Sequence, residues 1–242
     1  MRQYHYDVKQ YPLAGIALKS VQKYYPDVKD LSLLHEHVPA KKVGELSKEI
    51  GKDLADGCFY VIFDELIKDH ISLGEILVQR FGNIRINIPN QDKDGTVLPF
   101  HQGQWVGNGL GLRTVWLPFT DAYDSNSLQL VNLMDSREIT DACKEWDYLR
   151  LQEECKKSCE PVNLKNGQFI LFTQEHIHGA APNRTGKTRM SVDVRLLLKG
   201  GQPHRKWPGA YFRKLGDTDI HSRKVEIKHN DNVVMYAEYE GF

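Results

Sequence analysis

The sequence has no long hydrophobic run. None of its 242 residues lies in a stretch that approaches the roughly 20 apolar residues a helix needs to cross a bilayer. The first residues, MRQYHYDVKQYPLAG, also lack the apolar segment of a secretory signal peptide. We therefore expect a cytoplasmic protein without a membrane partner.

Cysteine is scarce, and neither sign of charge is in excess. The four cysteines form no CxxC pair, so we do not expect a structural zinc site. Lysine plus arginine equals aspartate plus glutamate at 32 each, and this balance argues against a nucleic-acid partner. Nothing in the composition indicates an oligomeric state.

Internal repeats and low-complexity tracts are also absent, which argues against a solenoid or a disordered linker. The length suffices for one domain with a well-buried core. We predict a single domain over residues 1–242, with a helical part at 1–81, a β-rich core at about 82–199 and a tail at 200–242.

Helical periodicity dominates the first third of the chain. Apolar residues recur there at spacings of three and four, as in amphipathic helices. The pattern predicts helices at Gly15–Tyr25, Val43–Asp56 and Tyr60–Gln79. A charged helical insert is expected at Asp135–Lys157, with a solvated outer face.

From Gly82 onward the pattern changes to short strands separated by turn residues. The predicted strands are Asn83–Pro89, Val97–His101, Leu112–Phe119, Ser127–Val131, Gly167–Gln174 and Thr188–Lys199, with weaker signals at Val225–Lys228 and Val233–Tyr236. Helices followed by many short strands indicate an α+β protein built on a β-sandwich or barrel.

Polar residues recur at the ends and on one face of these strands. His101 ends one strand, and His178 follows the apolar QFILF next to Gly179, where a small residue permits a close approach. Side chains alternate along TRMSVDVR, so one face carries Arg189, Ser191, Asp193 and Arg195. Inside a barrel this face needs a polar ligand or mutual ion pairs.

Two segments that contain these residues resemble the non-haem Fe(II)/2-oxoglutarate oxygenases. They are VLPFHQG…VWLPFTDAYDSNSLQLV and NGQFILFTQEHIHGAAPNRTGKTRMSVDVR. They look most like the phytanoyl-CoA hydroxylase-like group and the streptomycin-biosynthesis-type oxygenases of carbohydrate and antibiotic clusters. The resemblance covers about Asn83 to Lys199. It implies a double-stranded β-helix (jelly roll), with Fe(II) and 2-oxoglutarate as cofactors.

The resemblance also implies roles for the histidines. His101 and His178 would be the iron ligands, because neutral imidazole suits Fe(II) and two such ligands leave coordination positions open. His176 is a competing ligand two residues earlier. We prefer His178 because its HG followed by PN matches the family pattern.

For 2-oxoglutarate, the resemblance implies that Arg189 pairs with the distal carboxylate and that Ser191 adds a hydroxyl donor. Arg195 is the alternative to Arg189, although it lies late for the usual spacing. Arg85 and Asn87 alternate inward on NIRINIP and would face cosubstrate or substrate.

The family's His-x-Asp or His-x-Glu pattern is broken, because the sequence reads His101-Gln102-Gly103. Aliphatic halogenases of the superfamily carry glycine or alanine there, so Gly103 would leave room for chloride. Alternatively, Gln104 or, less favourably, Glu175 supplies the ligand. A two-histidine site with water would still hydroxylate, and a degenerate site would only bind.

Other polar residues are weaker candidates. Trp105 and Asn108 follow the first histidine and could line a substrate pocket or pack the loop. Asn126 and Gln129 lie near a strand expected to flank the iron, whereas Asn183 is expected to cap a turn.

The sequence thus predicts an Fe(II)/2-oxoglutarate-dependent dioxygenase or halogenase. Its substrate would be a small polar metabolite, such as a sugar, amino sugar or amino acid, attacked at an aliphatic C–H. Gly103 leaves both hydroxylation and halogenation open. The alternative is a non-catalytic jelly-roll ligand-binding protein with a degenerate metal site.

Overall fold

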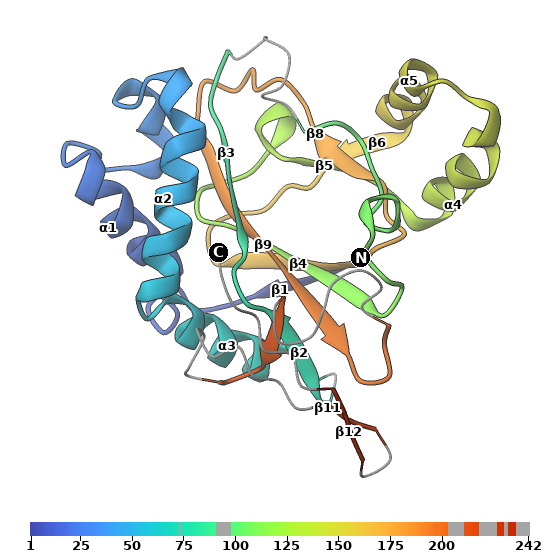
Figure 1. Cartoon of the computed structure of the whole chain (residues 1–242). Coiled ribbons are helices and arrows are strands. Elements are labelled where there is room, and N and C mark those ends of the chain that lie inside the picture. Colours follow the sequence, from blue (N-terminus) through green and yellow to red (C-terminus); the bar gives the residue numbers. More distant parts are fainter. Residues whose placement is uncertain (73, 91–97, 203–210, 218–226, 230–231, 236–242) are drawn as a thin grey trace.

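Two antiparallel sheets form the framework of the protein in a computed structural model (Figure 1). The structure describes residues 1–72, 74–90, 98–202, 211–217, 227–229 and 232–235. The larger sheet has the order β1-β7-β4-β9-β2-β10, with β3 also paired to β9. Its strands are β1 Arg2–His5, β2 Ile76–Gln79, β3 Asn83–Asn87, β4 Leu112–Pro118, β7 Gln168–Thr173, β9 Arg189–Leu198 and β10 Phe212–Lys214.

The smaller sheet has the order β6-β5-β8. Its strands are β5 Leu128–Val131, β6 Cys159–Pro161 and β8 His178–Ala180, and a single bridge joins His101 to His178 beside β8. A separate hairpin pairs β11 Ile227–His229 with β12 Asn232–Met235. The predicted α+β class and jelly-roll core are confirmed.

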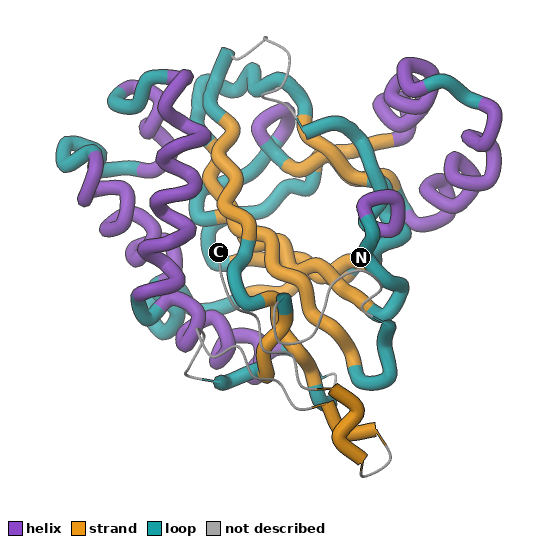
Figure 2. Tube along the Cα trace, viewed as in Figure 1, coloured by secondary structure: helices purple, strands orange, loops and turns teal. Residues whose placement is uncertain are grey.

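Three helices cover the outer face of the larger sheet (Figures 1 and 2). They are α1 Leu13–Tyr24, α2 Val43–Asp56 and α3 Phe59–His70. Two short 3-10 helices, η1 Leu31–Glu36 and η2 Ala40–Lys42, lie between α1 and α2 in the chain. On α2 the buried residues Leu46, Ile50 and Leu54 recur at the helical period, and they belong to the same core as Val192 of β9. No helix in the described part of the chain is both long and apolar enough to span a membrane.

One predicted helix, Tyr60–Gln79, is too long. Helix α3 ends at His70, Ile71 is extended, and Gly74 has a φ of +72° that turns the chain. The ILVQ segment then forms β2 between β9 and β10. An apolar run this short fits either structure, and pairing with two neighbours decides for the strand.

Strand predictions at the edges were less accurate. Residues 98–100 form no strand and His101 forms only an isolated bridge, while residue 97 lies outside the described residues. The sequence did not indicate the short strands β1, β6, β8 and β10, three or four residues long. The two tail signals overlap β11 and β12, and residues 225, 226 and 236 lie outside the description.

The helical insert comprises α4 Leu133–Ala142, the turn η5 Cys143–Glu145 and α5 Tyr148–Ser158. Most of its residues are exposed, as expected, but its buried residues make contacts that the sequence did not indicate. Gln152 accepts from the backbone N–H of Phe100 and donates to its carbonyl, both at 2.8 Å. Buried Cys155 and Ile139 pack against Phe100. The insert therefore supports the segment that leads to His101.

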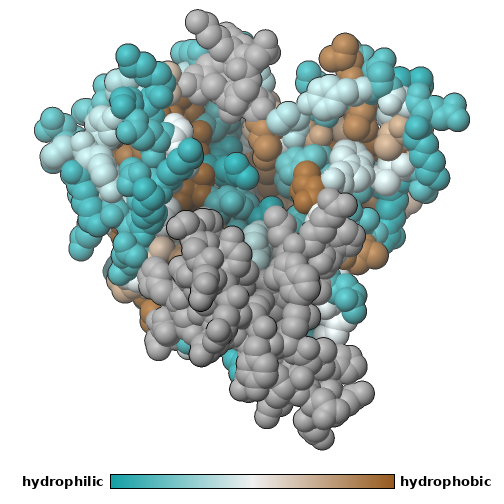
Figure 3. All heavy atoms as spheres, in the orientation of Figure 1, coloured by the Kyte–Doolittle hydropathy of each residue, from teal (hydrophilic) through white to brown (hydrophobic). Residues whose placement is uncertain are grey.

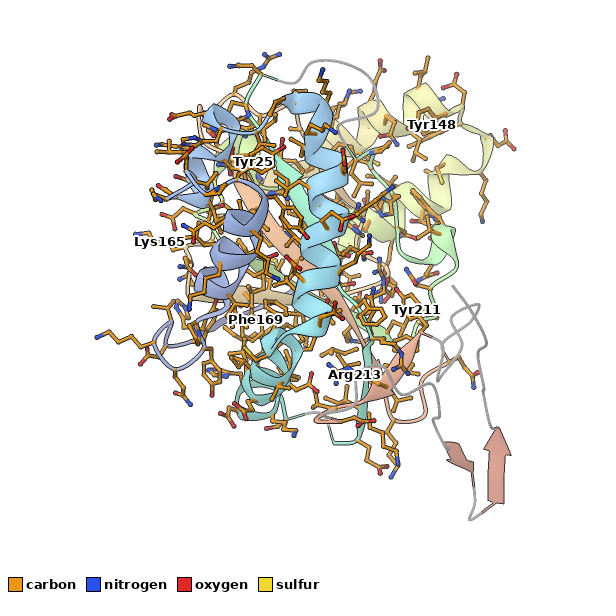
Figure 4. All side chains as sticks on the ribbon, turned by 60° about the vertical axis from the view of Figure 1, so that its left-hand side comes forward. Tyr25, Tyr148, Lys165, Phe169, Tyr211 and Arg213 are labelled. Atoms are coloured by element: carbon orange, nitrogen blue, oxygen red, sulfur yellow. The ribbon has the colours of Figure 1, made fainter. Side chains whose placement is uncertain are left out.

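A buried ion pair joins β10 to α3 (Figure 4 labels Arg213). Arg213 Nη2 donates to Asp64 Oδ1 at 2.8 Å, and the backbone N–H of Gly216 donates to Asp64 Oδ2 at 2.6 Å. The Arg213 guanidinium lies 5.8 Å from the centre of the Tyr60 ring. Both charged groups are thus paired, as buried charges must be.

Candidate functional site

A cavity of about 310 Å³ lies between the two sheets. Its lining comes from β3, β4, β7 and β9 of the larger sheet, from β5 and β8 of the smaller one, and from α2. Figure 3 shows the molecule hollowed on this face, between the α2 side and the α4–α5 insert, with hydrophilic residues in the hollow. This is the place where a jelly roll can hold a polar ligand.

His101 and His178 lie side by side on the cavity wall. Each backbone N–H donates to the other residue's carbonyl at 3.0 Å, and the ring centres are 4.4 Å apart. Gly179 permits this arrangement, because a Cβ there would lie 3.1 Å from Leu98 O and from Phe100 Cα. The small residue thus admits the backbone of the segment that carries His101, as the sequence indicated.

Both imidazole rings are fixed in the same tautomer. His101 Nδ1 lies 2.9 Å from Pro99 O, and His178 Nδ1 lies 3.0 Å from His176 O. A carbonyl only accepts, so each Nδ1 carries the proton and each Nε2 keeps a lone pair for a metal. Burial lowers the pKa of His101, and burial plus the neighbouring His101 lowers the pKa of His178 to about 3. Both rings are therefore neutral at pH 7, as metal ligands must be.

His176 is not part of this wall. It is buried away from the cavity lining, and its Nδ1 lies 2.9 Å from Thr173 Oγ1. The geometry agrees with the preference for His178 over His176.

The space beside Gly103 is filled. A Cβ built on Gly103 would overlap Gln174 Oε1 and would lie 2.8 Å from Gln174 Cδ. Gln174 is buried and donates from Nε2 to Thr114 Oγ1 at 2.9 Å. The position where a side chain on residue 103 would begin is therefore occupied by the amide side chain of Gln174.

The other candidates for a third ligand lie away from the two histidines. Gln104 begins the short turn η3 Gln104–Val106 and does not line the cavity. Glu175 is paired with Arg137 of α4 at 2.8 Å. Within the described ranges, no group of three His, Cys, Asp or Glu residues could hold a metal. The structure therefore does not support Gln104 or Glu175 as a ligand.

Arg189 is buried at the far end of the polar face and lines the cavity. Its Nε donates to Asn126 O at 3.0 Å and its Nη1 to Ser191 Oγ at 3.1 Å. No carboxylate pairs with it among the residues that the structure describes. Burial, and secondarily the nearby Arg85, lowers the pKa of Arg189 to about 10. A buried guanidinium without an anion fits the carboxylate of a ligand.

Along the same face, the other charged groups pair with one another. Asp193 accepts from Arg85 Nε at 3.2 Å and from Arg195 Nη1 at 3.4 Å. Arg195, the alternative to Arg189, thus already shares a carboxylate with Arg85. Asn87 lies opposite Arg189 in the β3–β9 register and lines the cavity. Arg85 also lines the cavity.

The weaker candidates have structural contacts. Neither Trp105, which is exposed, nor Asn108, which is buried, lines the cavity. The side-chain oxygen of Asn126 accepts from the backbone N–H of Tyr123 at 2.8 Å. Arg189 is bonded to the backbone carbonyl of Asn126 instead. Gln129 donates to backbone carbonyls. Asn183 accepts from the N–H of Thr185 at 3.0 Å, which confirms the predicted turn.

The sequence reasoning missed three residues of the site, namely Thr114, Trp116 and Gln174. Trp116 Nε1 donates to Ser191 Oγ at 3.2 Å, and both Thr114 and Trp116 line the cavity. Inward alternation along LRTVWLP was a usable signal for Thr114 and Trp116. No sequence signal pointed to Gln174.

The model of the phytanoyl-CoA dioxygenase family (PhyH) matches residues 33–191, which is more than half of the chain and includes both histidines and Arg189. The chain belongs to this family. Members of the phytanoyl-CoA dioxygenase family use Fe(II) and 2-oxoglutarate, and the donor set described above fits both. No curated protein matches the chain.

Three solved structures are among those similar to this chain. A "non-heme monooxygenase, ThoJ-Ni complex" is 17% identical over 91% of this chain and 82% of its own, with a TM-score of 0.45. The epimerase SnoN, in complex with Fe3+, alpha ketoglutarate and nogalamycin RO, is 11% identical over 83% and 80%, with a TM-score of 0.47. AviO1 from Streptomyces viridochromogenes Tue57 is 12% identical over 82% and 88%, with a TM-score of 0.46. Similarity this distant does not bear on the reaction of this family member.

Proposed function

We propose that this member of the family is a 2-oxoglutarate-dependent oxygenase that hydroxylates an aliphatic C–H of a small, acidic, polar metabolite. One observation carries the proposal. Two neutral histidines with oriented Nε2 atoms share a cavity with a buried arginine, Arg189, that has no carboxylate partner within the described residues.

His101 and His178 would hold Fe(II) through Nε2, and Arg189 would hold the distal carboxylate of 2-oxoglutarate. When bound, Fe(II) and 2-oxoglutarate would supply the electrons that activate oxygen for attack on a C–H bond, with one oxygen atom ending in succinate and the other in the hydroxylated product. Arg189 is oriented before binding, by Asn126 O and Ser191 Oγ. Ser191 Oγ also accepts from Trp116, so its own hydrogen remains to donate to the carboxylate. Such orientation lowers the entropic cost of binding.

Gln174 favours hydroxylation over halogenation. Halogenation would require an empty volume in place of the acidic ligand. In this chain the buried amide of Gln174 fills the volume next to Gly103. We therefore propose that oxygen rather than halide is transferred.

The charge of the cavity favours an acidic substrate. Among the described residues of the lining, three arginines (Arg85, Arg189 and Arg195) face one aspartate, Asp193. The dianionic cosubstrate balances the charge of Fe(II), and no acidic ligand adds to it. Two positive charges then remain, and they favour a substrate with a carboxylate or phosphate. Arg85, whose side chain is 45% exposed, is the residue we assign to this group.

Turnover tests the proposal. With Fe(II), oxygen and 2-oxoglutarate, the protein should form succinate, and a panel of sugar acids and amino acids should stimulate the reaction more than neutral sugars do. The rate and the product should not change between chloride-free and chloride-containing buffer. A chlorinated product would contradict hydroxylation. No succinate under any condition would favour the non-catalytic binding protein.

A further inference from the structure

Gln174 lies just after β7, with its side chain against Gly103. The atoms nearest a Cβ built on Gly103 are all from Gln174: it would overlap Oε1 and lie 2.8 Å from Cδ and 3.1 Å from Gln174 Cβ. Real Cβ atoms do not approach other heavy atoms below 3.0 Å. Because Cδ itself is too close, exchanging the amide oxygen and nitrogen would not relieve the overlap.

We propose that Gln174 is a positioning residue that has taken the place of the missing acid, so that Gly103 and Gln174 form one matched pair. An acidic ligand can then return at position 103 only if Gln174 is removed. The inference rests on the proposed function for its metal, but the steric pairing itself needs no metal.

The Gln174 side chain is held in this position. It is 2% exposed, and its Nε2 donates to Thr114 Oγ1 at 2.9 Å. Thr114 is in the central strand β4, which pairs with β7 on one side and with β9 on the other. Rotating Gln174 away from Gly103 would break this hydrogen bond in a buried position, at the cost of an unsatisfied polar group.

The backbone around Gly103 is also held. Gln102 Nε2 donates to Glu175 O and to Thr140 Oγ1, both at 2.7 Å, and Gly103 O accepts from Asn108 N at 3.0 Å. The first of these bonds ties the residue before Gly103 to the residue after Gln174. A side chain added at position 103 therefore cannot be accommodated by moving the loop, and the relief must come from residue 174.

The exchange of an acid for an amide has an electrostatic consequence. Gln174 is neutral, so the Gly103–Gln174 pair lacks the negative charge that Asp or Glu at position 103 supplies in the family pattern. An isosteric carboxylate at position 174 should therefore strengthen cation binding next to His101 and His178. An acid at position 103 should do the same once Gln174 is shortened.

A double-mutant cycle on the metal-free protein tests the pairing. Gly103→Ala, Gln174→Gly and the double variant are unfolded by heat. We expect Gly103→Ala to lower the melting temperature by several degrees, and to lower it little in the Gln174→Gly background, where the added methyl group has room. Additive shifts would overturn the pairing. This readout does not depend on whether the protein binds iron.

Cobalt(II) titration, followed by visible absorption without 2-oxoglutarate, tests the consequence for the metal. We expect Gln174→Glu and the double variant Gly103→Asp/Gln174→Gly to bind Co(II) at least about tenfold more tightly than the natural protein. Gly103→Asp alone should not. Gln104→Glu, a partly exposed position in η3 next to Gly103, is the matched control and should leave the affinity unchanged.

The outcomes separate the two proposals. The matched pair would be overturned if Gly103→Asp, with Gln174 present, raised the Co(II) affinity as much as the double variant does. It would also be overturned if the natural protein bound Co(II) and Gln174→Glu did not raise the affinity. If no variant binds Co(II) while the unfolding cycle is strongly non-additive, the pairing stands and the proposed metal function fails.

Discussion

Arg189 and Arg213 are both almost completely buried, and they differ in the groups that face them. Arg213 is 0% exposed and pairs with Asp64, which also accepts from the backbone of Gly216. Arg189 is 5% exposed and donates to the carbonyls of Asn126 and Arg85 and to the Ser191 hydroxyl, with no carboxylate partner in the described part of the chain. Arg213 has its counter-charge within the fold, whereas we propose that Arg189 receives one from a ligand.

The comparison explains why a buried arginine can stabilise the core in one region and bind a ligand in another. A buried charge with a carboxylate partner costs little to keep and much to disrupt. A buried charge without a partner lowers the stability of the unliganded protein, and this cost is returned when an anion binds. Burial at Arg189 is therefore a property of the binding site rather than of the core.

The largest effect is expected at the completed pair. Asp64→Asn leaves the Arg213 guanidinium buried without a counter-charge, and we expect a loss of about 3–5 kcal/mol in the free energy of unfolding. Urea unfolding measures it. A loss below about 1 kcal/mol would show that the pair contributes little.

Arg189→Met should reduce ligand binding much more than it reduces stability. The unliganded protein should lose far less stability than Asp64→Asn does, because the change removes an unpaired buried charge. The free energy of 2-oxoglutarate binding should fall by about 2–5 kcal/mol. Calorimetric titration measures this, with Arg195→Met as the matched control, since Arg195 already pairs with Asp193. Equal losses of affinity in both variants would remove the distinction.

Acid should destabilise the metal-free site. The pKa of His178 is about 3 in the folded protein, mainly because of burial, against about 6.5 when unfolded. Its neutral form therefore stabilises the fold fully above pH 6.5, and this contribution is lost as the pH falls from about 6.5 toward 3. Unfolding at a series of pH values should give a shallower decline for His178→Asn. Parallel curves for the two proteins would contradict the assignment.

The smallest effect is expected at the residue that orients Ser191. Trp116→Phe keeps the ring volume approximately and removes the N–H that donates to Ser191 Oγ. We expect 2-oxoglutarate binding to weaken by about 0.5–1.5 kcal/mol, with iron binding unchanged. An unchanged affinity for 2-oxoglutarate would mean that the indole does not orient Ser191.

The sequence predicted those parts of the fold whose pattern is local and repeated. The bounds of α2 were predicted to the residue, because its apolar residues recur over a full helix. The inward face of β9 followed from the alternation in RMSVDVR. The span of β2 was misassigned, because its three apolar residues and a glutamine acquire their structure from β9 and β10 rather than from their own pattern.

The sequence predicted the site residues that follow from alternating side chains on a strand or from the family motifs. It could not predict contacts between residues that are far apart in the chain. His101, His178 and Arg189 line one cavity, as expected. The space beside Gly103 could not be read from the sequence, because residue 174, far along the chain, fills it. Likewise, nothing local marks Gln152 as the support of Phe100.

The central claim is that two histidines and Arg189 form an Fe(II) and 2-oxoglutarate site without an acidic ligand. Anaerobic titration of Fe(II) and 2-oxoglutarate, followed by the visible charge-transfer band of the chelate, tests it most directly. The account predicts a band in the natural protein that does not shift with chloride, is lost in His178→Ala and is retained in His176→Ala. A natural protein without a band, or a His178→Ala variant that keeps it, would contradict the account.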